Sequence, residues 1–219
     1  WDGKIRLFNI HNRLLYGGLL EYVFIFAEPR NYRVAPIGFE WKPKKIAENK
    51  AFFKDLKLPF EPRDYQLEGF YHALSYKKCL LVSPTASGKS LIIYLIVRAL
   101  NVKTLIIVPT TSLVSQLYAD FQEYGWDSAK FCHQVYAGQD KVSDKQVVIS
   151  TWQSIYKLNK KLFEPYKLVI GDEAHGFKSK SLTSIMTKCV NAEYRIGTTG
   201  TLDGTQTHKL VLEGLFGKI

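Results

Sequence analysis

The stretch Ser83–Ser90, SPTASGKS, decides the fold class of this chain. It ends like a phosphate-binding loop of the pattern G-x-x-x-x-G-K-[ST], although Ser83 stands where the pattern has its first glycine. The tripeptide alone is weak evidence, because Gly-Lys-Ser/Thr is expected by chance in roughly one chain of this size in ten. Its neighbours must decide between a nucleotide site and an ordinary turn with a solvated lysine.

The flanking segments favour the nucleotide site. Cys79–Pro84 is a short apolar run typical of a buried parallel strand, and Ser90–Leu100 has the length and composition of a helix. A strand, a tight loop and a helix start direct backbone N–H groups and the helix dipole at one point, which suits a phosphate. Gly88 then permits close approach of the backbone, Lys89 reaches the β- and γ-phosphates, and Ser90 ligates Mg²⁺. The predicted nucleotide-binding residues of the loop are Pro84, Thr85, Ala86, Ser87, Gly88, Lys89 and Ser90.

A second segment completes the site. Lys167–His175, KLVIGDEAH, is another apolar strand that ends in two adjacent carboxylates. Mg²⁺ prefers oxygen ligands, so Asp172 is placed to hold the ion through its water shell. Glu173 is placed to orient and deprotonate the attacking water. An Asp-Glu pair at the end of a strand, in a chain with a separate Gly-Lys-Ser loop, is a specific combination that chance seldom produces. It predicts an ATP and Mg²⁺ site with Lys89, Asp172 and Glu173 as catalytic residues and Ser83 as a tolerated variant.

These segments resemble motifs of the superfamily 2 helicases. Ser83–Ser90 is similar to motif I, and Asp172–His175 is similar to motif II of that superfamily. Pro62–Gln66 resembles its adenine-reading element, which assigns Arg63 and Gln66 to the base. Gly197–Leu202 stands where motif III links hydrolysis to DNA binding, with Gly200 in place of the usual alanine. The resemblance implies that the residues coupling the two events are His175, Thr199 and Thr201.

Two further segments resemble the motifs that contact the nucleic-acid backbone, namely Ile106–Gln116 and Val147–Ile155. The contact residues that they imply are Pro109, Thr110, Thr111, Gln116, Thr151, Trp152 and Gln153. Within the superfamily the chain is most similar to the UvsW helicases of T4-like phages, including outside the motifs at residues 1–9, 12–19 and 210–219. Ala174 stands where a cysteine is expected in that group. The resemblance implies an enzyme that acts on branched or forked DNA or RNA–DNA hybrids in recombination, replication and repair.

The order of apolar segments predicts an α/β fold with a mostly parallel sheet covered on both faces. With the resemblance, this is a RecA-like P-loop domain over residues 58–219, preceded by a small basic α+β domain with a linker over residues 1–57. The strands are predicted at Cys79–Ser83, Thr104–Val108, Phe131–Val135, Val147–Ser150, Leu168–Gly171 and Tyr194–Thr198, and the helices at Leu91–Leu100, Ser112–Tyr124, Ser181–Val190 and Thr207–Leu215.

Residues 1–57 differ in composition from the rest. Lys4–Ile10 suggests a hairpin, Gly17–Pro36 suggests a helix and then a strand, and the charged linker Lys42–Pro59 is partly helical. Residues 1–60 hold 11 Lys/Arg against 6 Asp/Glu, which is +5 of the formal charge of +10. Two interpretations stay open: a DNA-binding unit that uses Trp1, Arg6, Arg13 and Arg30, or a packing appendage with solvated basic residues. The opening at Trp1, without a methionine, suggests that the unit is cut at its front.

The composition narrows the classes of protein. A net charge of +10 and a pI near 9.4 suit a polyanionic partner. Three cysteines without C-x-x-C spacing disfavour a zinc site or a disulfide framework. The chain shows no signal-peptide pattern and no apolar run of 18 residues, so no membrane partner is expected. The expected location is the cytoplasm, which is the host cytoplasm if a phage encodes the protein.

The family's motors hydrolyse ATP between two RecA-like domains, and no second domain follows Gly204. We therefore expect a fragment that is nearly inactive alone, because an arginine finger contributes about 10³–10⁵ in rate. Two alternatives share these motifs: the translocase subunit of a type I or III restriction enzyme, and a non-catalytic ATP-gated nucleic-acid-binding module. The presence of Lys89, Asp172 and Glu173 disfavours the second alternative.

Overall fold

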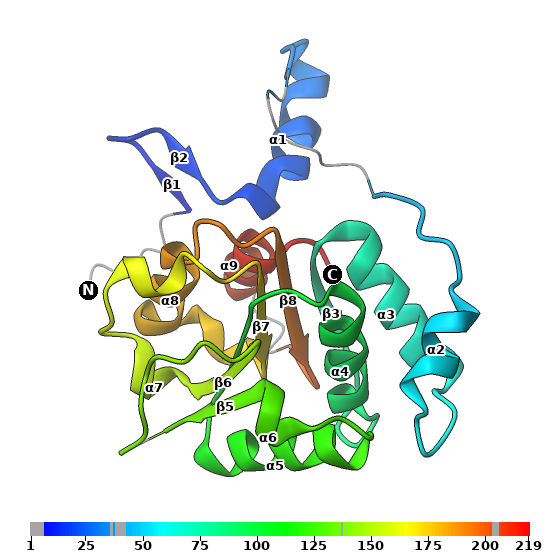
Figure 1. Cartoon of the computed structure of the whole chain (residues 1–219). Helices are drawn as coiled ribbons and strands as arrows, with labels where there is room; N and C mark the ends of the chain where they lie inside the picture. Colours follow the sequence, from blue (N-terminus) through cyan, green and yellow to red (C-terminus); the bar gives the residue numbers. More distant parts are fainter. Residues whose placement is uncertain (1–6, 36, 38–42, 137, 203–205) are drawn as a thin grey trace.

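The structure is a computed structural model that describes residues 7–35, 37, 43–136, 138–202 and 206–219. A large α/β unit forms the body of the molecule, and a short hairpin with one helix projects from it (Figure 1). In the described part of the chain, no helix combines the length and apolar character that crossing a bilayer requires.

The large unit is built on a sheet of six strands that are all parallel, in the order β3-β8-β7-β4-β6-β5. Only the pairs β5–β6 and β7–β8 join strands that follow one another in the sequence, and helices lie in every connection except the one from β5 to β6, where none is described. The strands are β3 (Lys78–Val82), β4 (Thr104–Val108), β5 (Cys132–Val135), β6 (Val147–Thr151), β7 (Leu168–Asp172) and β8 (Tyr194–Thr199).

The inner strands β4, β6 and β7 are mostly apolar because both faces of the sheet are buried there. In β4, Ile106 and Val108 belong to one core, whereas Leu105 and Ile107 belong to the other. Two layers of helices form these cores. The first layer contains α2 (Lys50–Leu56), α3 (Asp64–Tyr76), α4 (Lys89–Leu100), α5 (Thr111–Glu123) and α6 (Ser128–Phe131). The second contains α7 (Trp152–Ile155), η3 (Lys160–Phe163), η4 (Ala174–Lys178), α8 (Lys180–Lys188) and α9 (Gln206–Phe216).

The predicted α/β class and the mostly parallel sheet are confirmed, and the predicted strands differ from the observed ones only at their ends. Several short helices and one long helix were missed. Residues 64–76 form α3, whose Phe70 and Ala73 are buried in the first core. A partial signal was available, because Gln66 is placed to accept from the Arg63 amide, which it does at 2.9 Å, and apolar residues follow at helical spacing.

The N-terminal unit contains a two-stranded antiparallel hairpin of β1 (Phe8–Asn9) and β2 (Leu14–Leu15), followed by η1 (Gly17–Leu19), α1 (Leu20–Ala27) and η2 (Glu28–Arg30). The predicted hairpin and helix are present. The strand predicted after the helix is wrong within residues 31–35, which are neither helix nor strand. Asn31 turns the chain with φ 56°, and β1 and β2 are each only two residues long, which leaves a third strand little to pair with. Trp1 and Arg6 lie outside the described residues.

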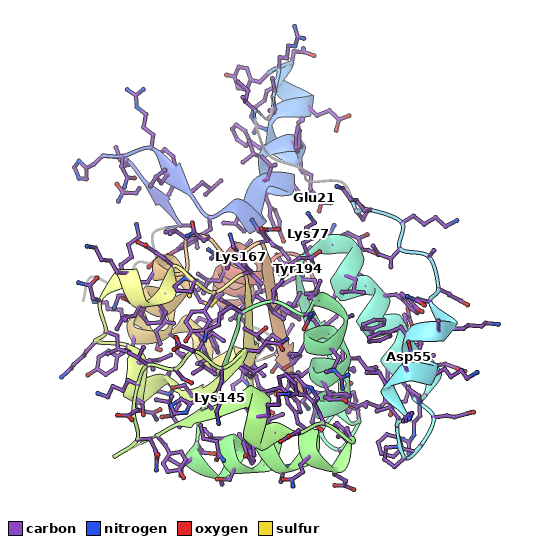
Figure 2. The ribbon with its side chains drawn as sticks, in the orientation of Figure 1. Glu21, Asp55, Lys77, Lys145, Lys167 and Tyr194 are labelled. Carbon is purple, nitrogen blue, oxygen red and sulfur yellow. The ribbon has the colours of Figure 1, made fainter. Side chains whose placement is uncertain are left out.

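The N-terminal unit is docked on α9 by close backbone packing. A Cβ at Gly18 would lie 1.8 Å from the Glu213 carbonyl oxygen, and one at Gly214 would lie 2.9 Å from the Tyr16 Cβ. The Tyr22 hydroxyl donates to the Glu213 carboxylate at 2.6 Å, and this bond, with burial, raises the pKa of Tyr22 to about 12. Glu21, labelled in Figure 2 where the two units meet, accepts a hydrogen bond from Lys218 at 2.6 Å.

The predicted linker contributes to the large unit. Its residues 50–56 form α2, where Leu56 is buried, and the Phe52 ring stacks on Phe70 of α3 at 5.8 Å between centroids. The predicted boundary after residue 57 remains a prediction, but the packing of α2 groups it with the sheet rather than with the hairpin.

Candidate functional site

The loop between β3 and α4 has the geometry of a phosphate-binding loop. Gly88 caps α4 with φ 78° and ψ 41°, the left-handed region that favours glycine. A Cβ at this position would also lie 2.4 Å from the Gln66 side-chain nitrogen. Glycine is therefore required here for both its backbone conformation and its size. Pro84, Thr85 and Ala86 are exposed, so the loop is open to a ligand.

Ser83 is accommodated without strain. It is not among the described residues with positive φ, so its backbone does not need glycine. Its hydroxyl forms a 2.6 Å hydrogen bond with the Ser87 hydroxyl, and its amide donates to the Thr199 carbonyl at 2.9 Å. The unusual conformation in the loop falls instead on Ala86, at φ 64°. These contacts explain why the loop can form with serine in the first glycine position.

The Lys89 side chain folds back over the loop in which it is predicted to bind phosphate. Its ammonium donates to the carbonyls of Ser83 and Pro84, each at 3.3 Å. These bonds hold the ammonium at the loop, and it forms no ion pair with a carboxylate among the described residues. Gly200 lies on the other side, because a Cβ there would be 3.2 Å from the Thr85 hydroxyl oxygen and 3.8 Å from the Lys89 nitrogen. The glycine that replaces the usual alanine of motif III thus faces the phosphate-binding loop.

The two carboxylates lie at the end of β7, beside β8. Asp172 is 8% exposed, and the Thr198 hydroxyl donates to its Oδ1 at 2.7 Å. Thr199, the next residue of β8, accepts the bond from Ser83. The phosphate-binding loop, β8 and the acidic pair are therefore joined by hydrogen bonds across three adjacent strands.

Glu173 and Thr199 share one histidine nitrogen. His175 Nδ1 lies 3.3 Å from Glu173 Oε2 and 3.1 Å from Thr199 Oγ1. The Thr199 hydroxyl donates its single proton to the Thr201 carbonyl at 2.9 Å, so Nδ1 must be the donor to Thr199. Glu173 has φ 51°, a conformation that is uncommon outside glycine and occurs often at active sites. The three predicted coupling residues are thus brought together with the predicted base.

The predicted adenine-reading pair lies against the loop. Gln66 is buried; its Oε1 accepts from the Arg63 amide at 2.9 Å and its Nε2 donates to the Ser87 carbonyl at 3.0 Å. The Arg63 guanidinium donates to the Tyr65 hydroxyl at 3.1 Å, and that hydroxyl donates to the Ser87 carbonyl at 2.9 Å. An amide oxygen accepts two hydrogen bonds, so Gln66 Oε1 retains one for a base edge.

Gln66→Ala is expected to reduce the preference of the chain for ATP over GTP by up to about tenfold, since one hydrogen bond to a base edge contributes about 0.5–1.5 kcal/mol. Competition of ATP and GTP against a fluorescent ADP analogue measures the ratio. Gln122→Ala is the matched control, because it makes the same chemical change at an exposed position on α5 and should leave the ratio unchanged. Equal competition by ATP and GTP in the unmutated protein would contradict the assignment.

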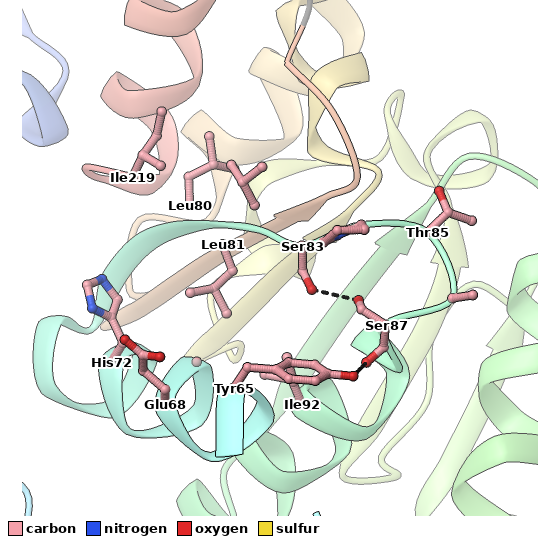
Figure 3. Close-up of a pocket in the computed structure, with 14 residues that line it drawn as sticks. Tyr65, Glu68, His72, Leu80, Leu81, Ser83, Thr85, Ser87, Ile92 and Ile219 are labelled. Atoms are coloured by element: carbon pink, nitrogen blue, oxygen red, sulfur yellow. Dashed lines mark hydrogen bonds between the residues drawn. The ribbon is translucent and has the colours of Figure 1, made fainter. Parts of the chain in front are cut away.

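A cavity of about 660 Å³ adjoins the outer side of the loop. Figure 3 shows Tyr65, Glu68 and His72 of α3 on one wall and Leu80 and Leu81 of β3 on another. The loop residues from Ser83 to Ser87 form its rim, and neither Arg63 nor Gln66 is among its described lining residues. The cavity is therefore next to the phosphate-binding loop but separate from the predicted adenine pair.

The predicted nucleic-acid contacts follow β4 and β6, which are neighbours in the sheet. Of these seven residues, Thr110, Thr111, Gln116 and Gln153 are exposed, and Gln153 Nε2 donates to the Pro109 carbonyl at 3.3 Å. Thr151 and Trp152 are less accessible. Thr151 is 4% exposed with its hydroxyl bonded to Ser154 at 2.8 Å, and Trp152 packs on the second core. The exposed members are the ones free to meet a nucleic-acid backbone.

Three residues at the site were not predicted from the sequence. Thr198 orients Asp172, as described above, and its place beside Thr199 in motif III was a usable signal. Tyr124 and Asp120 are the others; the Tyr124 hydroxyl, at the end of α5, hydrogen-bonds the Ser90 side chain, and Asp120 of α5 lies near it. No local sequence pattern predicts these two residues, because only the packing of α5 on α4 brings them close to Ser90.

Comparison with known proteins agrees with this geometry. The model of one family, described as type III restriction enzyme, res subunit (ResIII), matches residues 59–204. The chain belongs to the ResIII family. This match covers the adenine-reading segment, the phosphate-binding loop, the acidic pair and motif III, and ends before α9.

The ATP-dependent DNA helicase UvsW of Enterobacteria phage T4 is 33% identical over 235 aligned residues, which cover 100% of this chain and 46% of that protein. The DNA 3'-5' translocase XPB2 of Sulfurisphaera tokodaii is 33% identical over 150 residues, or 68% of this chain and 33% of that protein. The chain thus spans less than half the length of these curated relatives.

A crystal structure of the UvsW helicase from bacteriophage T4 matches 100% of this chain and 83% of that chain, with a TM-score of 0.88 and 32% identity. The predicted resemblance to the UvsW helicases is confirmed. A Sulfolobus solfataricus SWI2/SNF2 ATPase core, solved in complex with dsDNA, matches with a TM-score of 0.58 and 20% identity, which supports the fold alone.

Proposed function

We propose that the chain is the nucleotide-binding half of an ATP-dependent DNA helicase or translocase. The observation that carries the proposal is the hydrogen-bonded continuity of Ser83, Thr199, Thr198 and Asp172 across β3, β8 and β7. Through these bonds the loop Ser83–Ser90 and the acidic pair lie side by side, near β4 and β6, which are followed by the exposed Thr110 and Gln153.

The residues present fit a Mg²⁺-bound nucleotide. Gly88 and the start of α4 present backbone N–H groups to phosphates, and Lys89 supplies a cation. Ser90 and Asp172 supply oxygen ligands of the kind that Mg²⁺ prefers, Asp172 through water. When bound, the ion neutralises charge on the phosphates. Glu173 would orient and deprotonate the attacking water, and His175 would pass a change at Glu173 to Thr199 and Thr201.

The proposed substrates are branched or forked DNA and RNA–DNA hybrids, in recombination, replication and repair. The support is the similarity to the T4 helicase along the whole chain, including the N-terminal unit outside the family model. By the same similarity the proposed location is the host cytoplasm. We also propose that a second RecA-like domain completes the ATPase site, so that this chain alone is nearly inactive.

The two alternatives are less well supported. A restriction translocase shares the motifs and the family description, but the two curated relatives described above are a helicase and a translocase. A non-catalytic ATP-gated module does not need the arrangement of Glu173, His175 and Asp172 at the end of β7.

The proposed function is tested with the full-length protein that contains this chain. A forked duplex with one labelled strand should be separated when ATP and Mg²⁺ are present, and not with ATP and EDTA. Strand separation would identify a helicase, and ATP-dependent displacement of a third strand from a DNA triplex would identify a translocase. Cleavage of the DNA would instead favour a restriction enzyme, and ATP-dependent binding without either would favour the non-catalytic module.

The N-terminal unit is proposed to bind DNA. Arg13, Arg30 and Arg33 are exposed on it, and the Arg30 guanidinium lies 3.9 Å from the centroid of the exposed Phe26 ring. Cations beside exposed aromatic rings are typical of surfaces that bind nucleic acids. The unit cannot shift freely, because Gly18 and Gly214 pack it on α9.

Replacing Arg13, Arg30 and Arg33 together with glutamine is expected to weaken binding to forked DNA and to flatten its salt dependence. Each phosphate contact adds about 0.9 to the slope of log affinity against log salt on duplex DNA, so three contacts predict a change of roughly 2.7. Fluorescence anisotropy at several salt concentrations measures the slope. Glutamine at Lys45, Lys50 and Lys54 removes the same charge beside and on α2 and should change the slope less. If the two triple variants give the same slope of log affinity against log salt, the arginines do not contact DNA specifically, and the N-terminal unit is a packing appendage.

A further inference from the structure

The side chain of Ser90, the predicted Mg²⁺ ligand of the loop, already has partners. Its Oγ lies 2.9 Å from the Tyr124 hydroxyl, and it is near Asp120, where burial raises the pKa of the carboxyl and the interaction with Ser90 opposes the rise. Both partners come from the end of α5, which crosses the bottom of the view in Figure 1 beneath α4. Ser90 is therefore oriented by a different helix from the one on which it lies.

Tyr124 is held firmly in this position. It caps the C-terminus of α5 and is only 8% exposed. Its ring meets Phe60 edge-on at 5.7 Å and Tyr94 edge-on at 5.2 Å, and its carbonyl accepts from the Tyr94 hydroxyl at 3.3 Å. The direction of the hydroxyl toward Ser90 is thus set by packing on two sides.

The chemistry of a serine ligand explains what these partners would do. A hydroxyl that ligates a cation gives a lone pair to the ion, and its proton must then point to an acceptor. The Tyr124 hydroxyl oxygen and the Asp120 carboxylate are such acceptors, and they lie on the side of Ser90 that faces α5. Hydrogen-bond partners of metal ligands typically contribute 10–100-fold to metal affinity.

We propose that Tyr124, together with Asp120, is a positioning residue that turns the lone pair of Ser90 toward Mg²⁺. The inference rests on the proposed function, which makes Ser90 a ligand. It gives α5 a role at both ends, since the helix starts beside the exposed Thr110, a predicted nucleic-acid contact, and ends at the metal ligand.

Tyr124→Phe tests the proposal, because it keeps the packed ring and removes only the hydroxyl. The affinity of the chain for a fluorescent ADP analogue is measured over a range of Mg²⁺ concentrations and in EDTA. We expect the Mg²⁺ concentration for half-maximal enhancement to rise about tenfold or more, with the affinity in EDTA unchanged. A merely structural defect would lower both affinities. An unchanged Mg²⁺ dependence would overturn the proposal.

Three further variants complete the test. Tyr118→Phe is the matched control, because it also removes a tyrosine hydroxyl from α5. In the described residues the Tyr118 hydroxyl forms no hydrogen bond with Ser90, so this variant should behave like the unmutated protein. Asp120→Ala should repeat the effect of Tyr124→Phe. It therefore still tests the proposal if the Tyr124 variant fails to fold. Ser90→Ala should abolish the Mg²⁺ dependence. If Ser90→Ala leaves the Mg²⁺ dependence of nucleotide binding unchanged, both the proposed metal site and the inference are wrong. If Ser90→Ala changes this dependence but the Tyr124 and Asp120 variants do not, only the inference is wrong.

Discussion

Replacing Glu173 with glutamine in the full-length protein is expected to slow ATP hydrolysis at least about a hundredfold, while ATP and DNA still bind. Glutamine keeps the size of the side chain and its contact with His175 Nδ1, which lies 3.3 Å from Glu173 Oε2. It cannot take a proton from water, and one general base contributes about 10²–10⁴ in rate. Steady-state phosphate release with saturating DNA measures the loss.

The control for this variant is Glu164→Gln, the same chemical change at an exposed position between η3 and β7. It should hydrolyse ATP at the normal rate. Binding of the ADP analogue by both variants shows whether the site is intact. Near-normal turnover in Glu173→Gln would transfer the role of base to another residue, and lost nucleotide binding would mean that the change disturbed the loop at β7.

Lys89→Ala is expected to lower the affinity of the chain for Mg²⁺–ATP or Mg²⁺–ADP by about ten- to a hundredfold. Lys89 is the only side-chain cation in Ser83–Ser90, and charge-assisted hydrogen bonds contribute about 1.5–3 kcal/mol each. Its two present partners are backbone carbonyls at 3.3 Å, which a phosphate can replace. Titration with a fluorescent ADP analogue measures the change.

A nucleoside provides the control for the lysine variant. Adenosine has no phosphate, so its competition against the ADP analogue should give the same affinity with Lys89 and with alanine. A loss of adenosine binding would indicate a collapsed loop rather than a lost charge. Equal ADP affinity in the two proteins would remove Lys89 from the phosphate site.

Local patterns predicted much of this molecule because they depend on neighbouring residues. Each buried strand is a short apolar run, and the loop after β3 needs glycine where its backbone turns left-handed at Gly88. Where local signals were weak, the predictions failed. Residues 31–35 look suited to a strand but have no partner strand in the described unit, and α3 begins without a Ser, Thr, Asp or Asn cap, because Arg63 stands at that position.

The sequence by itself determined the α/β class, the segments that end in chemically active residues, and the identity of those residues. Only the tertiary structure decided which segments meet. The strands β4, β6 and β7 are buried along their whole length, so their sequences carry no record of their order in the sheet. Pairing of β8 between β3 and β7 brings Thr199 to Ser83 and Thr198 to Asp172. Packing of α5 on α4 brings Tyr124 to Ser90, and no local pattern encodes a contact between residues so far apart in the chain.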